Sequence, residues 1–381
     1  MRDARSLGNT PPMTKDWHRI INVDDVPSPA LLVYPDRVEE NVRRMVAIAG
    51  HPRRLRPHMK THKLPEVIKL QTDAGITQFK CATIAEAEMV AKCGVPDVLL
   101  AYQPLGPNVR RLIQLIKQHP RTRFSALVDD EAAARSLSKS FEAASLSIEV
   151  LLDLDTGMHR TGVEPGARAF ELYQLINKLP GLRAGGLHAY DGHLSVADLA
   201  ERTAKCDAAF EGVEGLKAQL ECARMPVPRV VAGGTPTFPI HAKREDVECG
   251  PGTCVFWDAG YGMKLPDMDF LVAALVLTRV VSKPGANRLC LDLGHKAIAA
   301  ENPHPRVRLL GLPDAKAVMH SEEHLVVETP RAGEFPVGAV FYGEPWHICP
   351  TVALHSQAVV VRANRAEARW QVVARERVLT V

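Results

Sequence analysis

Aromatic side chains and unbalanced charge are both scarce in this chain. Phe, Trp and Tyr make up 5% of the residues, which leaves few flat rings on which nucleic-acid bases could stack. The 47 Lys and Arg residues are nearly balanced by 44 Asp and Glu residues, for a formal net charge of +3. This balance argues against a nucleic-acid or membrane surface and is compatible with a small anionic ligand. We therefore expect neither a nucleic-acid partner nor a membrane partner.

Long apolar runs and paired cysteines are also missing. No stretch reaches the roughly 20 apolar residues that a membrane span needs, and the segment from Met1 to Trp17 lacks the apolar core of a secretory signal. The eight cysteines are dispersed and none forms a Cys-x-x-Cys pair, so we expect reduced thiols rather than a disulfide framework. These absences predict a cytoplasmic protein.

The apolar pattern along the chain predicts a barrel. The first 19 residues carry Gly, Pro and Asn and are expected to be disordered or loosely ordered. From residue 20 to 265, short apolar runs alternate with amphipathic stretches, which is typical of β-α repeats around a parallel sheet. After a lead-in strand at 30–34, eight strand candidates indicate a (β/α)8 TIM-type barrel. They lie near residue 55 and at 78–82, 97–101, 124–128, 148–154, 184–189, 229–232 and 246–250.

The pattern changes after residue 265. Helical periodicity becomes rare, and apolar runs are separated by turn residues. We therefore expect residues 266–381 to form a second, mostly β domain. Its expected strands lie at 271–281, 288–292, 307–310, 325–328, 339–342, 357–361 and 370–374.

A basic cluster at residues 56–63, Arg-Pro-His-Met-Lys-Thr-His-Lys, follows the first expected barrel strand. Basic runs of this kind often form solvated loops. In a β/α barrel, however, catalytic groups project from the carboxyl ends of the strands. A lysine there can lose its proton through desolvation and neighbouring positive charge, and it then becomes a nucleophile for a carbonyl group. Arg56, His58 and Lys63 are the neighbours that could act on Lys60 in this way.

Five further segments complete a pattern that extends over most of the chain. They are 155–163 (DTGMHRTGV), 186–190 (GLHAY), 232–235 (AGGT), 250–253 (GPGT) and 345–351 (PWHICPT). Together with the basic cluster they make the chain resemble the D-threonine aldolase and D-serine dehydratase family over roughly residues 30–375. Members of this family are pyridoxal 5′-phosphate (PLP) enzymes with an alanine-racemase-like barrel of fold type III.

The resemblance implies which residues bind PLP. Lys60 would hold the cofactor covalently, Arg160 would approach its ring or phenolate, and Tyr190 would line the site from the sixth strand. Glycines after two late strands would let backbone N–H groups approach the phosphate. The whole expected set is Lys60, His58, Arg160, Tyr190, Gly233, Gly234, Thr235, Gly252 and Thr253. For the glycine segments, plain tight turns are the alternative interpretation.

His347 and Cys349 are the candidate metal ligands. Residues two apart on a strand point to the same face, so both side chains could bind one ion. The matching positions bind a divalent metal in the family. A thiolate beside an imidazole favours Zn²⁺, with Mn²⁺ or Mg²⁺ as alternatives, and two protein ligands leave positions for water and substrate. Cys349 follows the dehydratase pattern, because the aldolases pair the histidine with an aspartate.

Two residues are candidates for the catalytic base. The aldolases place a histidine directly after the tyrosine that corresponds to Tyr190. This chain has Asp191 there, and His193 follows two residues later. Elsewhere, including residues 321–324, the chain is closer to the aldolase branch.

The resemblance thus implies a PLP- and divalent-metal-dependent lyase that acts on D-β-hydroxy amino acids. It favours D-threonine aldolase, which cleaves its substrate to glycine and an aldehyde. The alternatives are a dehydratase of D-serine or D-3-hydroxyaspartate, an amino-acid racemase, and a PLP-binding protein without robust catalysis. The expected partners are a small D-amino acid and a second copy of the chain, since the family's barrels pair as homodimers.

Overall fold

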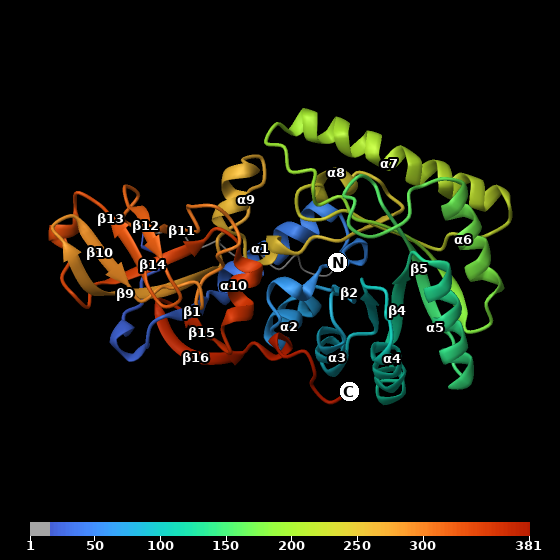
Figure 1. Cartoon of the computed structure of the whole chain (residues 1–381), viewed down its shortest axis with the longest axis horizontal. Helices are drawn as coiled ribbons and strands as arrows, with labels where there is room; N and C mark the ends of the chain where they lie inside the picture. The colour runs from blue at the N-terminus through green and yellow to red at the C-terminus, as the bar shows by residue number, and fades with distance from the viewer. Residues whose placement is uncertain (1–15) are drawn as a thin grey trace, which may run out of the picture.

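Two sheets organise the structure in the computed structural model, which describes residues 16–381. A seven-stranded parallel sheet, in the order β2 to β8, forms the barrel on the right of Figure 1, and a nine-stranded mixed sheet forms the part on the left. The predicted fold class, an α/β barrel followed by a mostly β domain, is confirmed. The barrel strands are β2 (Gln78–Cys81), β3 (Asp97–Leu100), β4 (Arg123–Val128), β5 (Ile148–Leu154), β6 (Leu182–Ala189), β7 (Val230–Ala232) and β8 (Val247–Cys249).

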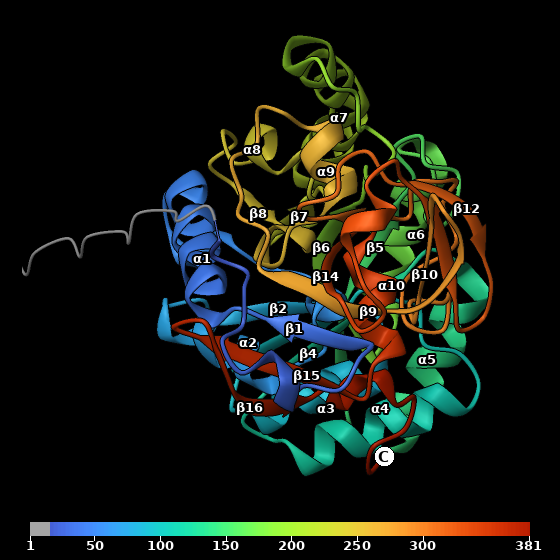
Figure 2. The same ribbon diagram turned by 90° about the vertical axis from the view of Figure 1, so that its left-hand side faces the viewer.

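Helices follow the strands and cover the outside of the barrel (Figure 2). Several begin where a side chain satisfies a free backbone N–H group. At the start of the helix Glu131–Ala143, for example, the Asp130 carboxylate accepts from Ala133 N at 2.9 Å. The helices of the described chain are α1 (Pro35–Ala49), α2 (Pro65–Asp73), α3 (Ile84–Lys92), α4 (Pro107–Gln118), α5 (Glu131–Ala143), α6 (Ala167–Lys178), α7 (Leu199–Cys222), α8 (Phe238–His241), α9 (Ala259–Lys264) and α10 (Ile348–Leu354). None of the helices within residues 16–381 is both long and apolar enough to span a bilayer.

The strand expected near Leu55 is not a regular strand. Leu55 forms an isolated parallel bridge with Cys249 of β8, and His58 forms one with Lys80 of β2. Pro57 lies between them and has no N–H group to donate, but its carbonyl accepts from Lys80 N at 2.9 Å. The segment 55–58 therefore connects β8 to β2 and closes the ring without forming a full ladder.

Alternating side chains fill the barrel in layers. Odd and even positions of a strand point to opposite faces, so one set faces the helices and the other faces the barrel axis. The middle of the interior is apolar and is formed by Leu99, Leu127, Leu151 and Val231. Nearer the carboxyl ends of the strands the inward residues become polar, and they include Lys80, Asp153 and His188, all buried. This polar layer lies at the end of the barrel where the family places its chemistry.

The opposite end of the barrel is closed by buried ion pairs. Arg56 is fully buried and bonds Asp97 at 2.7 Å and Glu248 at 2.6 Å. The network as a whole contains Arg56, Arg123, Arg229, Asp97, Glu149 and Glu248. Because Arg56 is withdrawn from water, its charge is stable only while its acidic partners are present.

We predict that Arg56→Met lowers the free energy of unfolding by about 3–5 kcal/mol, since it leaves buried carboxylates without their main partner. Chemical denaturation would measure the loss. Arg43→Met is the matched control, because the pair of Arg43 with Glu40 lies on the exposed surface of α1 and such pairs contribute about 0–1 kcal/mol. Equal stability of the two variants would contradict the prediction.

The second sheet contains strands from both ends of the chain. β1 (Ala30–Val33) pairs antiparallel with β9 and parallel with β15, so the lead-in strand lies in this sheet although residues from 20 onward were expected in the barrel. The boundary near residue 265 stays a prediction. The remaining strands are β9 (Ala274–Gly285), β10 (Arg288–Leu291), β11 (Val307–Leu309), β12 (Lys316–His320), β13 (Leu325–Glu328), β14 (Val340–Pro345), β15 (Gln357–Arg362) and β16 (Arg365–Gln371).

Two differences from the expected strands have local causes. β12 is a largely exposed strand at the sheet edge, so it lacks the apolar alternation that marks a half-buried strand. β16 begins at Arg365 because Ala363 and Asn364 form a tight turn after β15, with φ values of +44° and +60°.

The prediction for residues 1–19 falls mostly outside the described residues, which begin at 16. Residues 16–19 are in place: the Trp17 ring meets the Tyr34 ring edge-on at 4.9 Å, and Arg37 lies over Trp17 at 3.7 Å. In these four residues the indole ring thus has an aromatic and a cationic partner, and the expected loose order of the N-terminus stays a prediction.

Candidate active site

One cavity of about 550 Å³ brings most of the predicted site residues together. It opens at the carboxyl ends of the barrel strands and is bordered on one side by α10. Lys60 stands in its wall, in a short 3₁₀ turn (Met59–Thr61) after the segment that closes the barrel. The other predicted residues that line it are His58, Arg160, Tyr190, Gly234, Thr235, Gly252, Thr253, His347 and Cys349.

The glycines around the cavity are required by close contacts. A Cβ on Gly234 would lie 2.8 Å from the Tyr190 ring, and a Cβ on Gly252 would lie 3.1 Å from Thr61 Oγ1. Gly233 does not line the cavity, but it has a φ of +78° that favours glycine. We call Gly233, Gly234, Gly250 and Gly252 the glycine cradle.

Two backbone N–H groups at the glycine cradle already have a hydrogen-bond acceptor within the protein. Thr235 Oγ1 accepts from the backbone N–H groups of Gly252 at 3.2 Å and Thr253 at 3.0 Å. Those two N–H groups were expected to approach a phosphate directly. Thr235 also hydrogen-bonds the buried Cys254 thiol, so its own hydroxyl group is partly engaged.

Cations surround the Tyr190 ring. The Arg160 guanidinium lies 4.9 Å from the ring centre, and Lys60 Nζ lies 5.9 Å from it. The electron-rich face of a phenol ring attracts such groups and limits their positions. The predicted neighbours Lys60, Arg160 and Tyr190 are therefore brought together.

Three residues were expected to help Lys60 lose its proton through their positive charge. Two of them are neutralised by acidic partners of their own. Arg56 points toward the opposite end of the barrel, where Asp97 and Glu248 neutralise it. Lys63 bonds the buried Glu86. His58 does line the cavity, but burial, and then the charge of Lys60, lowers its pKa well below the usual value.

His347 and Cys349 do not lie on a strand, which corrects the geometry expected for the metal pair. β14 ends at Pro345, His347 precedes α10, and Cys349 lies in its first turn. The two side chains nevertheless hydrogen-bond each other. Burial opposes ionisation of both side chains, but their interactions together outweigh the effect of burial. Contact with Cys349 and Glu301 raises the pKa of His347 to about 9. Contact with His347 lowers the pKa of Cys349. The interaction of the two side chains thus favours a negatively charged sulfur beside a positively charged imidazole.

Neighbours that the sequence did not single out hold this pair. Glu301 Oε1 lies 2.5 Å from Nδ1 of His347, which leaves Nε2 on the other side of the ring. Cys349 Sγ lies 3.2 Å from Thr61 Oγ1 and 3.6 Å from Thr253 Oγ1. No sequence signal marked Glu301, which lies in an irregular segment 46 residues before His347.

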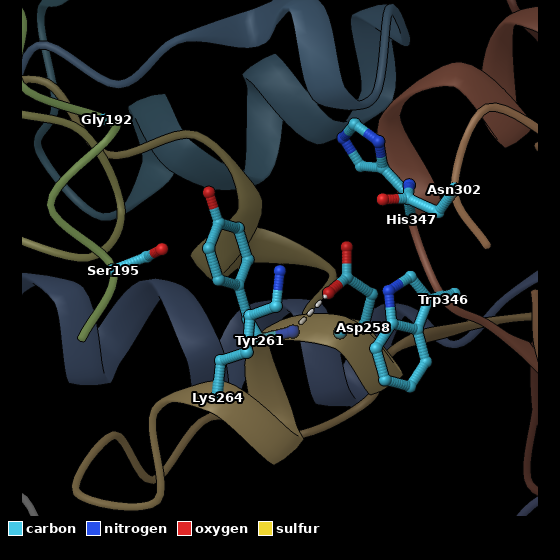
Figure 3. Close-up of a pocket in the computed structure, with 9 residues that line it drawn as sticks. Gly192, Ser195, Asp258, Tyr261, Lys264, Asn302, Trp346 and His347 are labelled. Carbon is cyan, nitrogen blue, oxygen red and sulfur yellow. Dashed lines mark hydrogen bonds between the residues drawn. The ribbon is translucent and has the colours of Figure 1, made fainter. Parts of the chain in front are cut away.

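Asp258 joins the helix of the pair to the barrel. Its carboxylate accepts from Tyr261 N at 2.9 Å and from Ile348 N at 3.1 Å, so it caps both α9 and α10. Figure 3 shows Asp258 between Tyr261 and Trp346, with the His347 ring on the far side of a smaller hollow of about 190 Å³. Burial raises the pKa of Asp258 to about 6. Its position as an N-cap ahead of Ala259 was a signal that the sequence analysis passed over.

Asp191 lies outside the cavity. It is buried and accepts from Thr237 Oγ1 at 2.6 Å and from His241 Nε2 at 2.7 Å. Burial would raise its pKa, but these bonds hold the pKa below the usual value. Its carboxylate is therefore occupied, which does not support the base role expected for it.

Asp191, Cys206 and His241 also place their donor atoms within 4.8 Å of one another, close enough for a metal ion. Their hydrogen bonds argue for a different role. Arg244 can only donate, so Nδ1 of His241 accepts from it at 3.1 Å, and Nε2 carries the hydrogen that goes to Asp191. Thr237, which like Cys206 also donates to Asp191, accepts from Gly234 N at 3.3 Å. The cluster thus supports the glycine cradle from behind.

We predict that Asp191→Asn lowers the melting temperature and weakens PLP binding. The amide would present a donor where two donors already point, at a cost of about 1–3 kcal/mol. Differential scanning calorimetry and a PLP titration would measure both effects, with the exposed Asp269→Asn as control. Unchanged melting and PLP affinity together with lost turnover would instead identify Asp191 as the base.

His193 is exposed and lies on the loop after β6. It does not line the cavity, but its Nε2 would be 3.3 Å from a Cβ on Gly157, in the loop that also carries Arg160. The structure thus brings His193 to the arginine loop and not to the cavity wall.

Comparison with known proteins agrees with this fold. The alanine racemase N-terminal domain model matches residues 33–259, and a serine dehydratase domain model matches residues 273–361. The chain is 30% identical to a D-threonine aldolase of Arthrobacter sp. over 372 residues, which covers 96% of both chains. It is 30% identical to a 3-hydroxy-D-aspartate aldolase of Paracoccus denitrificans (strain Pd 1222) over 367 residues, which covers 92% of both chains.

A solved structure extends the similarity to three dimensions. The crystal structure of D-threonine aldolase from Filomicrobium marinum matches with a TM-score of 0.86 and 30% identity, covering 92% of this chain and 96% of that one. The similarity spans both the barrel and the second sheet. The chain therefore belongs to the alanine racemase N-terminal domain family, in the branch of PLP-dependent lyases that contains the D-threonine aldolases.

Proposed function

We propose that this protein is a PLP- and divalent-metal-dependent D-threonine aldolase, which cleaves D-β-hydroxy amino acids to glycine and an aldehyde. One observation carries the proposal: Lys60 and the His347-Cys349 pair border the same cavity. An amine that can hold an aldehyde cofactor and a pair that can hold a metal thus face one substrate.

The residues around the cavity fit a phosphorylated, aldehyde-bearing ring. Lys60 supplies the amine, Arg160 and Tyr190 border the ring position, and the glycine cradle with Thr235 and Thr253 suits the phosphate, because a Cβ at Gly234 or Gly252 would intrude on neighbouring atoms. When bound, PLP supplies a conjugated ring that accepts the electron pair of the bond broken at the substrate's α-carbon. Binding and orienting the substrate beside it falls to the protein.

His347 and Cys349 suit a divalent ion through an imidazole nitrogen and a thiolate, and this donor set favours Zn²⁺ over Mn²⁺ or Mg²⁺. Glu301 would fix the ring by accepting from Nδ1, which is the usual arrangement behind a metal-bound histidine. An ion there would lower the pKa of the substrate's β-hydroxyl group.

His193 is the preferred candidate for the base that takes the hydroxyl proton. Its imidazole is exposed and lies against the loop of Arg160, whereas the carboxylate of Asp191 is already bonded to Thr237 and His241. An imidazole ring with a lone pair on one nitrogen can accept a proton.

Product analysis with D-threonine and D-serine tests the proposal. Glycine and acetaldehyde from D-threonine are the expected products. Pyruvate and ammonia from D-serine would identify a dehydratase, with Lys60 removing the α-proton. This second candidate is favoured by Cys349, which matches the dehydratases, and by the dehydratase domain match over residues 273–361. Absence of either reaction with any D-β-hydroxy amino acid would overturn both.

Two other functions make different predictions. A racemase needs a second acid or base across the substrate and no metal, so it would stay fully active after chelation. A PLP-binding protein without catalysis would be yellow but would convert no amino acid. Such proteins are typically a lone barrel, whereas this chain adds the β domain that carries His347 and Cys349.

We also propose a homodimer, on the resemblance alone. Sedimentation should give a species of twice the chain mass of 41.8 kDa. A single species at the chain mass would contradict it.

A further inference from the structure

Lys80 is a second lysine near the active site, and the proposed reaction leaves it without a role. It lies on β2 and is 1% exposed. Among the described residues, the hydrogen-bond partner of its Nζ is Nε2 of His188, at 3.5 Å. An ammonium group has three N–H donors. Two of them therefore have no hydrogen-bond acceptor in the described part of the chain.

Asp153 and His188 orient this amine from one side. Asp153 Oδ1 lies 2.6 Å from Nδ1 of His188. A carboxylate only accepts, so Nδ1 carries the hydrogen and Nε2 presents its lone pair to Lys80. Burial lowers the pKa of His188, although the hydrogen bond and the charge of Asp153 act in the opposite direction. The remaining N–H groups of Lys80 then point away from His188.

Gly250 leaves room for the Lys80 amine because it has no side chain. A Cβ at this position would lie 2.5 Å from Lys80 Nζ and 3.1 Å from the carbonyl oxygen of Gly233. Gly250 itself lines the cavity. The amine therefore sits directly behind the glycine cradle, at a point where any side chain larger than hydrogen would collide with it.

The surroundings of Lys80 carry more positive than negative charge on the cavity side. Lys60 and Arg160 border the cavity. Lys80 Nζ lies 5.7 Å from the centre of the Tyr190 ring. Burial, and then the charge of Lys60, lowers the pKa of Lys80 to about 7, although Asp153 and Asp191 act in the opposite direction. The other charged or titratable groups around it are Arg56, His58 and His188.

A buried cation with one neutral acceptor is unfavourable unless a counter-charge reaches it. The established ion pairs of the barrel lie at the opposite end. The cradle is where an anion would bring that counter-charge, because Gly250 borders the cavity, has no side chain and lies directly against Lys80 Nζ.

We propose that Lys80 is a further cofactor-binding residue, whose ammonium group, oriented by His188 and Asp153, attracts the anionic cofactor from behind the glycine cradle. This inference rests on the proposed function, because it takes the cradle to hold the phosphate of PLP. Lys80 would act there as a charge that strengthens binding, in addition to the covalent role of Lys60.

Binding of pyridoxine 5′-phosphate tests the proposal. This probe has the ring and the phosphate but no aldehyde, so its affinity does not depend on bond formation with Lys60. We expect Lys80→Met to weaken binding by about 30-fold or more, the usual loss when one partner of a buried charge pair is removed. Isothermal titration calorimetry measures it without any turnover. Lys69→Met is the matched control, because Lys69 pairs with Asp73 on the exposed face of α2.

The pH dependence gives a second readout. Below about pH 7 Lys80 is already charged in the free protein, so the advantage of the wild type over Lys80→Met is complete there. Above pH 7 the amine is increasingly neutral in the free protein and must gain a proton when the probe binds. The affinity advantage of the wild type over Lys80→Met therefore falls by up to tenfold per pH unit. Titration of the probe affects both proteins equally and cancels in the ratio.

Equal affinity in a folded Lys80→Met protein, judged by its circular dichroism and melting temperature, would overturn the inference. If that variant does not fold, Lys80→Gln replaces it, since glutamine keeps a donor without the charge, and undiminished affinity at pH 7 would again be decisive. Wild-type protein that binds no pyridoxine 5′-phosphate would instead overturn the proposed function. The two failures are therefore distinguishable.

Discussion

Replacing Lys60 by alanine is expected to lower turnover of D-threonine by more than about 1000-fold, because the neighbours of this proposed cofactor-binding amine cannot take its place. Lys63 is bonded to Glu86, and Lys80 lies behind the cradle rather than in the cavity wall. Borohydride treatment should leave the cofactor covalently attached to the wild type and not to Lys60→Ala. Absorbance of the protein after gel filtration measures the attachment.

The control for this experiment is Lys69→Ala, on the surface of α2. It should retain both colour and turnover. The interpretation of Lys60 would be wrong if Lys60→Ala kept its colour after reduction together with normal turnover. Loss of colour in Lys69→Ala would show that the treatment itself removes the cofactor.

Metal removal is expected to have the second largest effect. Incubation with EDTA should lower turnover by about 100-fold or more, and Zn²⁺, Mn²⁺ or Mg²⁺ should restore it to different extents. The reason is that His347 and Cys349, the proposed ligand pair, line the same cavity as Lys60. Turnover and metal content are measured on the same preparation.

Substitutions of the pair sharpen this prediction. His347→Ala should resemble the chelated enzyme, and Cys349→Asp should keep metal-dependent turnover but shift the preference from Zn²⁺ toward Mn²⁺ or Mg²⁺, since carboxylate oxygens suit harder ions. The exposed Cys222→Ala is the matched control. Full activity after chelation would contradict the metal site and favour the racemase interpretation.

The location of the candidate site could be predicted because its residues follow strand ends. In a parallel barrel all strands finish at the same end, so Lys60, Arg160, Tyr190 and the glycine segments had to converge whatever their spacing in the chain. The cavity confirms that convergence. The same reasoning could not separate Asp191 from His193, because two neighbouring loop residues can point in opposite directions.

Lys80 shows the limit of sequence reasoning most clearly. It lies in a short apolar strand, where the sequence analysis noted only the strand. Its importance follows from His188 on β6 and from Gly250 after β8, which are 108 and 170 positions away. Contacts at such separations are set by how the barrel closes, and no local pattern reports them.

Residue patterns were sufficient to predict the alternation of strands and helices in the barrel, the mostly β character of the second domain and the residues gathered at the cavity, because strand periodicity is a local property and parallel strands end on one side of a barrel. Three features became clear only in the folded protein: β1 joins the second sheet, His347 and Cys349 meet at the start of a helix, and the Asp191 carboxylate accepts from His241. Each of these depends on which distant segments pack together. Burial and hydrogen bonding between such segments assign a side chain its role, and both arise only once the chain has folded.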